Sequence, residues 1–462
     1  QVRDNTDGFG TQVYIIGAGP GDSELLTVKA QRILALADVV LYDYLAHPNV
    51  VMLAQSAIKL CVGKKKGAHS MSQEDIHALL LKYSKTRARI VRLKGGDPMI
   101  FGRSGEEMAF LRQHNIPFRI VPGITSAIAV PTYAGIPLTH RDVSQSVAFV
   151  TATRANDIQN MQFPVADTLV IMMGLLRLEA VVERLTEDWP ATTPIAIIAS
   201  GTLAAERVLE GTLDTICGLQ ATEQLAPPAL LVVGKVVAYR EVAKWRDALP
   251  LHAKRFVLFR ADHQQSQCRR LLQDSGAEVL SFPLNKMASQ PAALQSLDLG
   301  SYTHIIFTSE NGVRSFFACL AHQRRDVRCV AQACMVAIGP HTRACLAEYG
   351  IQADVVPEQH DSEGVVAALE GQLNAQHKVL VPTSSEAGDV LLNGIARTQA
   401  QCDQVTVYTN CVPDNIADMQ AWVQPTDYLV FMNAASVHRF FADGMPGSQH
   451  VEWGGIYSIG PK

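Results

Sequence analysis

Short apolar runs alternate with helix-compatible segments along most of this chain, and this alternation limits the fold more than any other feature. In the first half, seven runs have the length and composition of strands that are buried on both faces. These runs are residues 12–16, 39–42, 90–93, 147–150, 169–172, 195–199 and 230–233. The alternation predicts an α/β protein in which the runs are buried parallel strands.

The chain also shows a boundary between two halves. Its 462 residues exceed what one ordinary hydrophobic core holds, so roughly two to four domains are expected. A charged, helix-compatible stretch over residues 237–249 ends at Pro250, and a strand-like run follows at residues 255–259. Helices usually end before a proline, so we place the main boundary near residue 250 and expect the halves to fold separately.

The composition excludes several kinds of partner. Forty Lys and Arg stand against 44 Asp and Glu, so no global field attracts nucleic acid or an acidic membrane. No apolar run approaches the roughly 20 residues that span a bilayer, and the polar start lacks a signal-peptide pattern. The nine cysteines show no CxxC spacing, which is typical of reduced cytosolic thiols. We expect a cytoplasmic protein without a metal, and the missing initial Met indicates a processed or trimmed chain.

A glycine-rich turn follows the first predicted strand. Residues 17–22 read Gly-Ala-Gly-Pro-Gly-Asp, and Asp43 closes the next strand. This pattern resembles a dinucleotide site, in which glycines admit a pyrophosphate and a later carboxylate binds the ribose. Here Asp22 would repel a diphosphate, and Pro20 removes one backbone donor. A tight structural turn is the other interpretation.

A second loop, residues 94–103, again follows a predicted strand. Ligands in open parallel sheets bind at the carboxyl edge, and we expect both loops to emerge side by side there. Gly95 and Gly96 would allow a ligand close to the backbone, and Asp97 would accept hydrogen bonds from it. Taken alone, this loop is also compatible with a structural turn.

Six segments occur in a fixed order, and the residues that carry them are 17–22, 37–43, 62–64, 92–103, 121–126 and 135–141. Together they resemble the motifs of uroporphyrinogen-III C-methyltransferases, over about residues 11–245. The resemblance implies a tetrapyrrole methylase with lobes of about 11–143 and 144–250 and S-adenosylmethionine between them. It implies a homodimer that methylates C2 and C7 of uroporphyrinogen III, yielding precorrin-2 and S-adenosylhomocysteine.

The resemblance also implies roles for individual residues. The cofactor contacts fall on Pro20, Gly95, Gly96, Asp97, Ile100, Thr125, Ser126, Met173 and Gly201. Asp43 is the candidate base for the pyrrole N–H proton, and Lys64 is the candidate proton donor. An ordinary strand-terminal acid and one member of a solvated lysine run are the alternatives.

Uroporphyrinogen carries eight carboxylates, so a local positive charge is expected. The candidate partners are Lys64, Lys65, Lys66, His69, Arg103, His140 and Arg141. His140 is equally compatible with a histidine of the core. Two segments depart from the family, Thr151-Ala152-Thr153 in place of Thr-Gly-His and Met172-Met173-Gly174 in place of Tyr-Met-Gly. We expect slower activity or altered specificity from them, with the fold unchanged.

The second half contains a weak internal duplication. Residues 304–313 and 428–437 share one pattern, and each is followed later by Ile-Gly-Pro, at 338–340 and at 459–461. The first copy continues into a predicted helix, whereas the second stops at Lys462. We therefore expect an unfinished last lobe.

Three further segments, residues 307–313, 338–342 and 405–408, resemble uroporphyrinogen-III synthases. The resemblance implies two flavodoxin-like lobes within residues 254–462. Lobe one would hold 254–284 and 410–462, and lobe two 288–408. The implied reaction closes hydroxymethylbilane into uroporphyrinogen III with inversion of ring D, through an azafulvene that needs positioning more than strong acid or base.

Hydroxyl groups and backbone donors would suffice for such a reaction. The candidates are Thr308, Ser309, Thr342 and Tyr408, of which Tyr408 is best placed to assist departure of the hydroxyl. Ser and Thr after a strand often only cap the next helix, which is the alternative. Asn433 stands where a small hydroxyl residue is common, and with the short last lobe it puts synthase activity in doubt.

Two rival functions stay open at this stage. One is an NAD-type oxidoreductase in the first half, which the glycine-rich turn imitates. The other is a noncatalytic second half that binds substrate and passes it to its neighbour.

Overall fold

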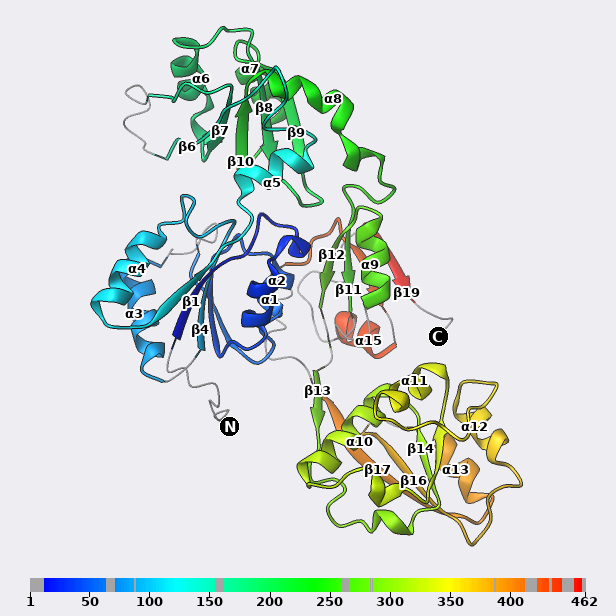
Figure 1. Ribbon diagram of the computed structural model, residues 1–462. Helices are drawn as coiled ribbons and strands as arrows, with labels where there is room; N and C mark the ends of the chain where they lie inside the picture. Colours follow the sequence, from blue (N-terminus) through cyan, green and yellow to red (C-terminus); the bar gives the residue numbers. More distant parts are fainter. Residues whose placement is uncertain are drawn as a thin grey trace. The chain divides into compact units, whose positions relative to one another are not determined.

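The computed structural model describes residues 12–63, 71–86, 89–153, 162–259, 266–282, 284, 286–385, 388–411, 422–431, 434–442 and 453–458. These residues form four β-sheets with helices packed on them (Figure 1), and the predicted α/β class is confirmed. The chain divides into two compact units. One comprises Gln1–Phe282, Trp422–Ala434 and Pro446–Lys462, and the other Pro283–Ala421 and Ala435–Met445.

The first sheet is parallel throughout, with the strand order β3-β2-β4-β1-β5. Its strands are β1 (Gln12–Gly17), β2 (Val39–Tyr42), β3 (Ile58–Cys61), β4 (Arg89–Lys94) and β5 (Phe118–Val121). Helices α1 (Val28–Leu34) and α2 (Pro48–Met52) cover one face, and α3 (Gln73–Ser84) and α4 (Ser104–Gln113) cover the other (Figure 1). All five strands therefore end at one carboxyl edge.

The second sheet has the order β6-β7-β10-β8-β9 and is mixed. Its elements are α5 (Ser126–Tyr133), β6 (Val147–Thr151), β7 (Thr168–Met172), α6 (Leu178–Thr186), β8 (Pro194–Ala199), β9 (Arg207–Thr212), α7 (Ile216–Glu223) and β10 (Ala229–Val233). Only the β6–β7 pair is parallel. The prediction of parallel strands is wrong for this sheet, because a strand buried on both faces has the same apolar sequence in either direction.

The predicted helical stretch over residues 237–249 is helical but divided. It consists of η3 (Lys235–Tyr239), α8 (Arg240–Ala243) and η4 (Trp245–Ala248). The next strand, β11 (Arg255–Leu258), opens the third sheet, whose order is β12-β11-β18-β19 and whose pairs are all parallel. Its other elements are α9 (Ser266–Asp274), β12 (Glu278–Ser281), β18 (Tyr428–Phe431) and β19 (Gly455–Ser458). Helix α15 (Ala434–Ala442) follows β18 in the chain, and from Ala435 onward it belongs to the second unit. This sheet belongs to the same compact unit as the first two.

The fourth sheet forms the second unit, with the order β13-β17-β16-β14-β15. Its strands are β13 (Lys286–Ser289), β14 (His304–Phe307), β15 (Cys334–Ala337), β16 (Lys378–Ser384) and β17 (Gln401–Cys411). Its helices are α10 (Glu310–His322), α11 (Pro340–Glu348), α12 (Ser362–Leu369) and α13 (Val390–Ala396). The edge pair β13–β17 is antiparallel, and the remaining pairs are parallel.

The duplication predicted in the second half corresponds to a repeated strand-to-helix unit. One copy is β14 followed by α10, and the other is β18 followed by α15. The first Ile-Gly-Pro begins α11 at Pro340, and the second, residues 459–461, lies outside the described residues. All nine cysteines are free thiols. Each helix in the described part of the chain is too short or too polar to cross a membrane.

Candidate active sites

Two glycine-rich loops meet at the carboxyl edge of the first sheet, where β1 and β4 are neighbours. The Gly19 N–H donates to the Gly96 carbonyl at 3.2 Å, and the Gly96 N–H donates to the Gly19 carbonyl at 2.7 Å. The predicted adjacency of the loops is confirmed. Reciprocal backbone hydrogen bonds hold the two loops in one arrangement. In this arrangement Gly96 has a φ of +64°, a conformation that residues with a side chain adopt less readily than glycine.

A third loop, after β5, packs against the first two. A Cβ at Gly17 would lie 2.5 Å from the Gly96 carbonyl oxygen and 2.7 Å from the Gly123 Cα. Asp97 joins the loops by its carboxylate, which accepts the Gly123 N–H at 3.0 Å and the Met99 N–H at 2.8 Å. Gly17 and Gly123 therefore serve loop packing, and Asp97 already has two partners within the protein.

Gly95 differs from these glycines because the space above it is open. The nearest heavy atom to a Cβ added there is the Leu45 Cβ, at 3.6 Å, an ordinary contact distance. Beside the next residue, Gly96, Thr125 caps α5 and Ser126 begins the helix. The protein thus leaves room against bare backbone at Gly95, as a ligand lying along the main chain requires.

Asp22, the residue that argued against a dinucleotide, is fully engaged within the protein. One oxygen caps η1 (Ser23–Leu25) by accepting the Glu24 N–H at 2.9 Å, and the other accepts the Tyr133 hydroxyl at 2.9 Å. Its own N–H donates to the Thr202 hydroxyl at 3.0 Å. A carboxylate held in this loop would face the pyrophosphate of a dinucleotide, so the geometry does not favour the oxidoreductase alternative.

Asp43 stands at the end of a buried chain of charges. Arg92 donates to its carboxylate at 2.6 Å and to Glu107 at 3.0 Å, and Lys94 also donates to Glu107 at 3.0 Å. The side chains of Arg92, Lys94 and Glu107 are 3%, 5% and 0% exposed, whereas that of Asp43 is 29% exposed. The chain of charges therefore presents a single carboxylate to the edge of the sheet.

Burial and pairing shift the titration of this network. Burial would raise the pKa of Glu107, but Arg92 and Lys94 outweigh it and hold that pKa below the usual value. Burial opposes the charge on Arg92, yet Asp43 and Glu107 keep the pKa of Arg92 above its usual value. Burial and the neighbouring Arg92 lower the pKa of Lys94. The sequence interpretation gave these three residues no role, although three charged side chains in a six-residue strand, Arg89, Arg92 and Lys94, were a visible signal.

The predicted basic residues are only partly placed. Lys64, Lys65, Lys66 and His69 lie outside the described residues. Arg103 is 64% exposed at the start of α4 and forms a two-point ion pair with Glu106, at 2.8 and 2.7 Å. A carboxylate ligand would have to displace Glu106 to use the guanidinium fully.

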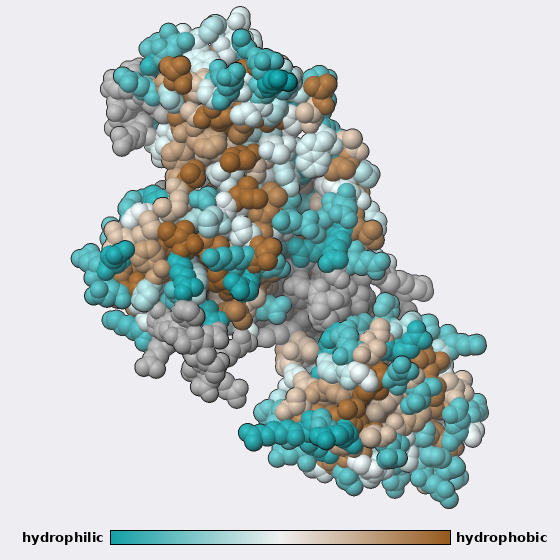
Figure 2. Space-filling view, viewed as in Figure 1, coloured by the Kyte–Doolittle hydropathy of each residue, from teal (hydrophilic) through white to brown (hydrophobic). Residues whose placement is uncertain are grey.

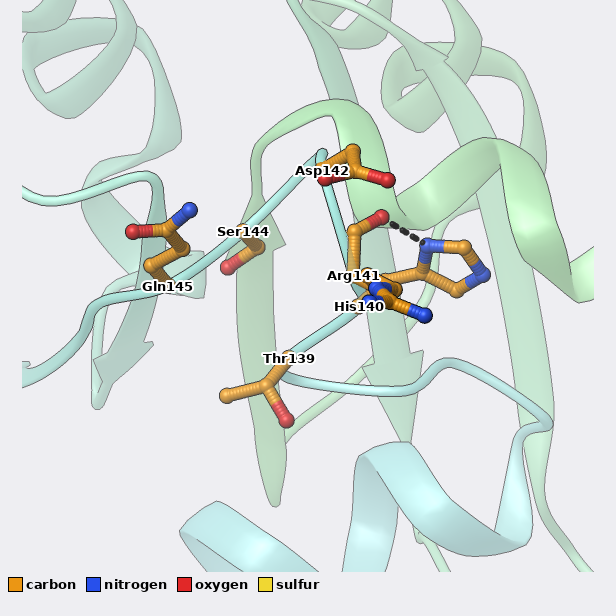
Figure 3. Close-up of a pocket in the computed structure, with 6 residues that line it drawn as sticks. All are labelled: Thr139, His140, Arg141, Asp142, Ser144 and Gln145. Carbon is orange, nitrogen blue, oxygen red and sulfur yellow. Dashed lines mark hydrogen bonds between the residues drawn. The ribbon is translucent and has the colours of Figure 1, made fainter.

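His140 and Arg141 line a shallow pocket of about 400 Å³. Ser144, which pairs with His140 in a β-bridge, lines it as well. Figure 3 shows the labelled side chains spread along one loop rather than converging on a point. The His140 ring donates to the Arg141 carbonyl at 2.8 Å and stacks on Tyr239, with ring centroids 4.0 Å apart. The histidine is half-buried, so neither the core interpretation nor an open ligand position describes it fully.

The two departures from the family lie together. The Thr153 hydroxyl donates to the Met173 sulfur at 3.7 Å, and it is hydrogen-bonded to the Thr151 hydroxyl. Met173 has a φ of +59° and is 46% exposed. Gly201 lies against α5, where a Cβ would meet the Val130 side chain at 2.3 Å. Thr153, which stands in place of the family's His, thus donates a hydrogen bond to Met173, the predicted cofactor contact.

Apolar side chains surround the strand ends of the first two sheets, where the predicted cofactor contacts lie. Those that follow strand ends and remain more than a third exposed are Tyr44, Leu45, Met99, Phe101, Ile124 and Met173. Ile128, on α5, is also exposed. Figure 2 shows hydrophobic residues on the viewed face around the region of α5. Exposed apolar groups beside a loop edge are typical of a binding surface for a flat organic ligand.

In the fourth sheet, two of the predicted hydroxyls come together. The Tyr408 hydroxyl lies 3.3 Å from the Ser309 hydroxyl, although 99 residues separate them. Ser309 also caps α10 by accepting the Gly312 N–H at 3.0 Å, so the capping alternative holds for it as well. Thr308 adjoins Ser309, whereas Thr342 is buried in the first turn of α11. Asn433 lies outside the described residues.

Comparison with known proteins assigns each half separately. Residues 12–217 match the model of the Tetrapyrrole (Corrin/Porphyrin) Methylases, and residues 266–461 match that of Uroporphyrinogen-III synthase HemD. The Porphyrin biosynthesis protein HemD of Ruminiclostridium josui is 31% identical over 445 residues, covering 93% of this chain and 88% of that protein.

Two other relatives match shorter parts of the chain. The Uroporphyrinogen-III C-methyltransferase of Bacillus subtilis (strain 168) is 36% identical over 326 residues, which cover 68% of this chain and 67% of the relative. The Siroheme synthase of Nitrosomonas europaea is 44% identical over 251 residues, and the match spans about half of each protein, 53%. With both halves matched in order and a relative aligned over nearly its whole length, the chain belongs to the HemD-type porphyrin biosynthesis proteins, in which a tetrapyrrole methylase precedes a uroporphyrinogen-III synthase.

Proposed function

We propose that this protein catalyses two consecutive steps of tetrapyrrole synthesis. The second half closes hydroxymethylbilane to uroporphyrinogen III, and the first half methylates that product at C2 and C7 to precorrin-2, which feeds siroheme or cobalamin synthesis. The observation that carries the proposal is the carboxyl edge of the first sheet, where open backbone at Gly95 and the paired carboxylate of Asp43 follow adjacent strands. The family matches of both halves support it.

S-adenosylmethionine supplies the methyl group on a sulfonium, which suits a site with bare backbone and exposed apolar groups. The proposed contacts are Pro20, Gly95, Gly96, Asp97, Ile100, Thr125, Ser126, Met173 and Gly201. Gly95 leaves the room that such a ligand needs, and the reciprocal bonds of Gly19 and Gly96 keep the loops in place. Thr153 orients the Met173 thioether through its hydroxyl.

Methyl transfer forms a bond between a pyrrole carbon and the methyl group while the carbon–sulfur bond breaks and its electron pair stays on sulfur. The pyrrole N–H must then lose a proton, and Asp43 is the acceptor in this proposal. Arg92 orients the carboxylate, and Glu107 holds Arg92 from behind. Because Arg92 and Glu107 are buried, the carboxylate keeps one direction toward the edge of the sheet.

Lys64 is proposed to return a proton, and the other cations to bind the substrate carboxylates. Arg103 and Arg141 are exposed, and Arg103 exchanges its partner Glu106 for a substrate carboxylate in this proposal. Such charge-assisted pairs are stronger than neutral hydrogen bonds and orient a polyanion. His140 supports this set from the pocket that it shares with Arg141.

In the synthase half, Tyr408 assists departure of the terminal hydroxyl by donating a hydrogen bond. The bond between carbon and the hydroxyl oxygen breaks, the hydroxyl leaves as water with the N–H proton of the same pyrrole ring, and a carbon of ring D attacks the azafulvene that remains. Ser309, 3.3 Å away, orients the phenol, and Thr308 and Thr342 contribute contacts to the substrate. Neutral donors suffice because positioning dominates such an intramolecular reaction.

The domain division and assembly belong to the same proposal. Residues 11–250 constitute the methylase, with lobes of about 11–143 and 144–250. Residues 254–462 constitute the synthase, with 254–284 and 410–462 in one lobe and 288–408 in the other. The protein acts as a cytoplasmic homodimer joined through the methylase half, and light scattering that reports a monomer would contradict the last point.

One assay tests both activities. Hydroxymethylbilane is supplied to the full chain with and without S-adenosylmethionine, and the products are separated by chromatography. We expect uroporphyrinogen III without the methyl donor and precorrin-2 with it. Uroporphyrinogen I alone would remove the synthase activity, and added uroporphyrinogen III that stays unmethylated would remove the methyltransferase activity.

A further inference from the structure

An edge strand of the third sheet is joined to the methylase by polar side chains. Strand β12 pairs on one side with β11 and ends the sheet on the other. Helix α2, which follows the Asp43 loop, lies against its open side (Figure 1). Open edges of sheets present unpaired N–H and C=O groups, so the partner that covers this edge is informative.

Asn49, from α2, supplies that partner. Its amide N–H donates to the Val279 carbonyl at 2.6 Å, and its amide oxygen accepts the Ser281 N–H at 3.1 Å. A side-chain amide offers one donor and one acceptor side by side, as a peptide unit of a neighbouring strand does. Asn49 is 6% exposed. The pairing therefore replaces water at the edge with a two-point contact that depends on one residue.

His47 adds a hydrogen bond at the same place. Its Nδ1 accepts the Asn49 N–H at 3.2 Å, which leaves the ring proton on Nε2, and Nε2 lies 3.4 Å from the Glu278 carboxylate. Burial would raise the pKa of Glu278, but the hydrogen bond from His47, followed by the Ala204 N–H and Arg255, holds that pKa below its usual value. Glu278 is thus an anion fixed in a largely buried position.

The second oxygen of Glu278 reaches the other methylase lobe. It accepts the Ala204 N–H at 2.7 Å, from the loop that follows β8 and contains Gly201. His47 follows Asp43 by four residues in the first lobe, and Ala204 follows Gly201 by three residues in the second. One carboxylate therefore binds loops of both lobes next to the proposed cofactor contacts. Arg269 adds a bond to the Ser23 hydroxyl, at 3.3 Å, in the turn after Asp22.

We infer that β12 is a clasp, defined by Glu278 with Val279 and Ser281, through which the synthase half sets the spacing of the two methylase lobes and so their affinity for S-adenosylmethionine. This inference rests on the proposed cofactor site. A ligand that touches Gly95 in one lobe and Gly201 in the other requires a fixed distance between them, and the clasp supplies it. All residues of the clasp and its partners belong to the same compact unit.

The coupling is reciprocal by thermodynamic necessity. If the clasp strengthens ligand binding, then ligand binding strengthens the clasp by the same factor. Bound S-adenosylhomocysteine should therefore slow hydrogen exchange of the Ser281 amide, which donates its hydrogen bond to the Asn49 side chain. This measurement uses the unaltered protein, so it does not depend on the folding of any variant.

The variants Glu278→Ala and Asn49→Ala of the full chain test the inference by calorimetry with S-adenosylhomocysteine. We expect Kd to rise about fivefold or more, the usual lower range of coupling between sites, and KM for S-adenosylmethionine to rise with it. Closure of hydroxymethylbilane should keep its rate, which shows that the synthase lobes remain folded. Glu363→Ala removes an exposed carboxylate of α12 and is the matched control.

The outcomes separate the two levels of the proposal. An unaltered protein that does not bind S-adenosylhomocysteine overturns the proposed cofactor site and the clasp with it. If the unaltered protein binds but both variants bind equally well, the clasp is overturned and the cofactor site stands. If bound S-adenosylhomocysteine does not slow hydrogen exchange at Ser281 in the unaltered protein, the clasp is likewise overturned and the cofactor site stands.

Discussion

At the carboxyl edge of the first sheet, Asp43 is held by a buried guanidinium 2.6 Å away, whereas the candidate site of the fourth sheet rests on the hydroxyls of Ser309 and Tyr408, 3.3 Å apart. In the proposed function the first arrangement removes a proton and accommodates a sulfonium, so charge is useful there. The second positions an intermediate that reacts by itself, and neutral groups suffice. The proposed chemistry of each step thus accounts for an ion pair at the first site and uncharged hydroxyls at the second.

The largest expected effect comes from the carboxylate. We expect Asp43→Asn to lower the rate of precorrin-2 formation by on the order of 10² to 10⁴, the range of general base catalysis, because the amide cannot accept the pyrrole proton. Steady-state assays with uroporphyrinogen III measure it. Asp188→Asn, on an exposed carboxylate at the end of α6, is the control. A variant at Asp43 with more than half of the original rate would remove the proton-acceptor role.

The open backbone should respond next. A Cβ at Gly95 meets no protein atom closer than 3.6 Å, so Gly95→Ala should fold normally and yet fill the space proposed for the ligand. We expect S-adenosylhomocysteine affinity to fall roughly 10- to 100-fold, as crowding of a packed site by a methyl group implies. Calorimetry measures it.

Gly105→Ala is the control for this change, because a Cβ there meets nothing within 4 Å. Equal affinity of both variants would show that Gly95 does not face the ligand. Loss of folding in Gly95→Ala would contradict the open space instead.

Tyr408→Phe sharpens the comparison from the other side. Removal of one hydrogen bond to the departing hydroxyl should slow closure of hydroxymethylbilane about tenfold, which corresponds to roughly 1.4 kcal/mol. Methylation of added uroporphyrinogen III should not change. The control is Tyr349→Phe, which removes a hydroxyl from a partly exposed ring that stacks on Phe317. If Tyr408→Phe closes hydroxymethylbilane at the original rate, Tyr408 does not assist departure of the hydroxyl, and other groups position the substrate.

The smallest effect concerns acid. The folded pKa values of Glu107 and Glu278 lie below 4.5, so their stabilisation is present above the unfolded value and is lost as the pH falls through the folded values. Below about pH 4.5, hydrogen exchange in α4 and β12 should accelerate a few-fold more than in α10, after correction for intrinsic rates. Glu278→Gln should flatten the response of β12. Equal acid responses in α4, β12 and α10 would contradict the difference in buried charge.

Much of the fold was readable because strands buried on both faces and their helices have distinct apolar periods. Seven predicted runs lie within observed strands, from β1 to β10, and the glycine-rich loops lie together as expected. The direction of β10, which is antiparallel to both of its neighbours β7 and β8, was not readable, since burial on both faces erases the difference between parallel and antiparallel pairs.

The site was only partly readable for a related reason. Asp43 and the loop glycines stand in local motifs, so their positions followed from the sequence. Arg92 and Lys94 of β4 form a network with Glu107 of α4, and no local pattern predicts which buried charges face one another. The pairing of Ser309 with Tyr408 likewise joins residues far apart in the chain.

The sequence by itself determined the α/β class and the residues that local turns require, because these depend on periodicity and backbone sterics over short distances. The order of the two enzyme-like halves followed from the resemblance of their motifs to two families. Only the tertiary structure decided the mixed second sheet, the partner of Asp43 and the contact of Glu278 with His47 and Ala204. These features arise where side chains distant in sequence are buried together, and there the cost of an unpaired charge or amide selects the partner.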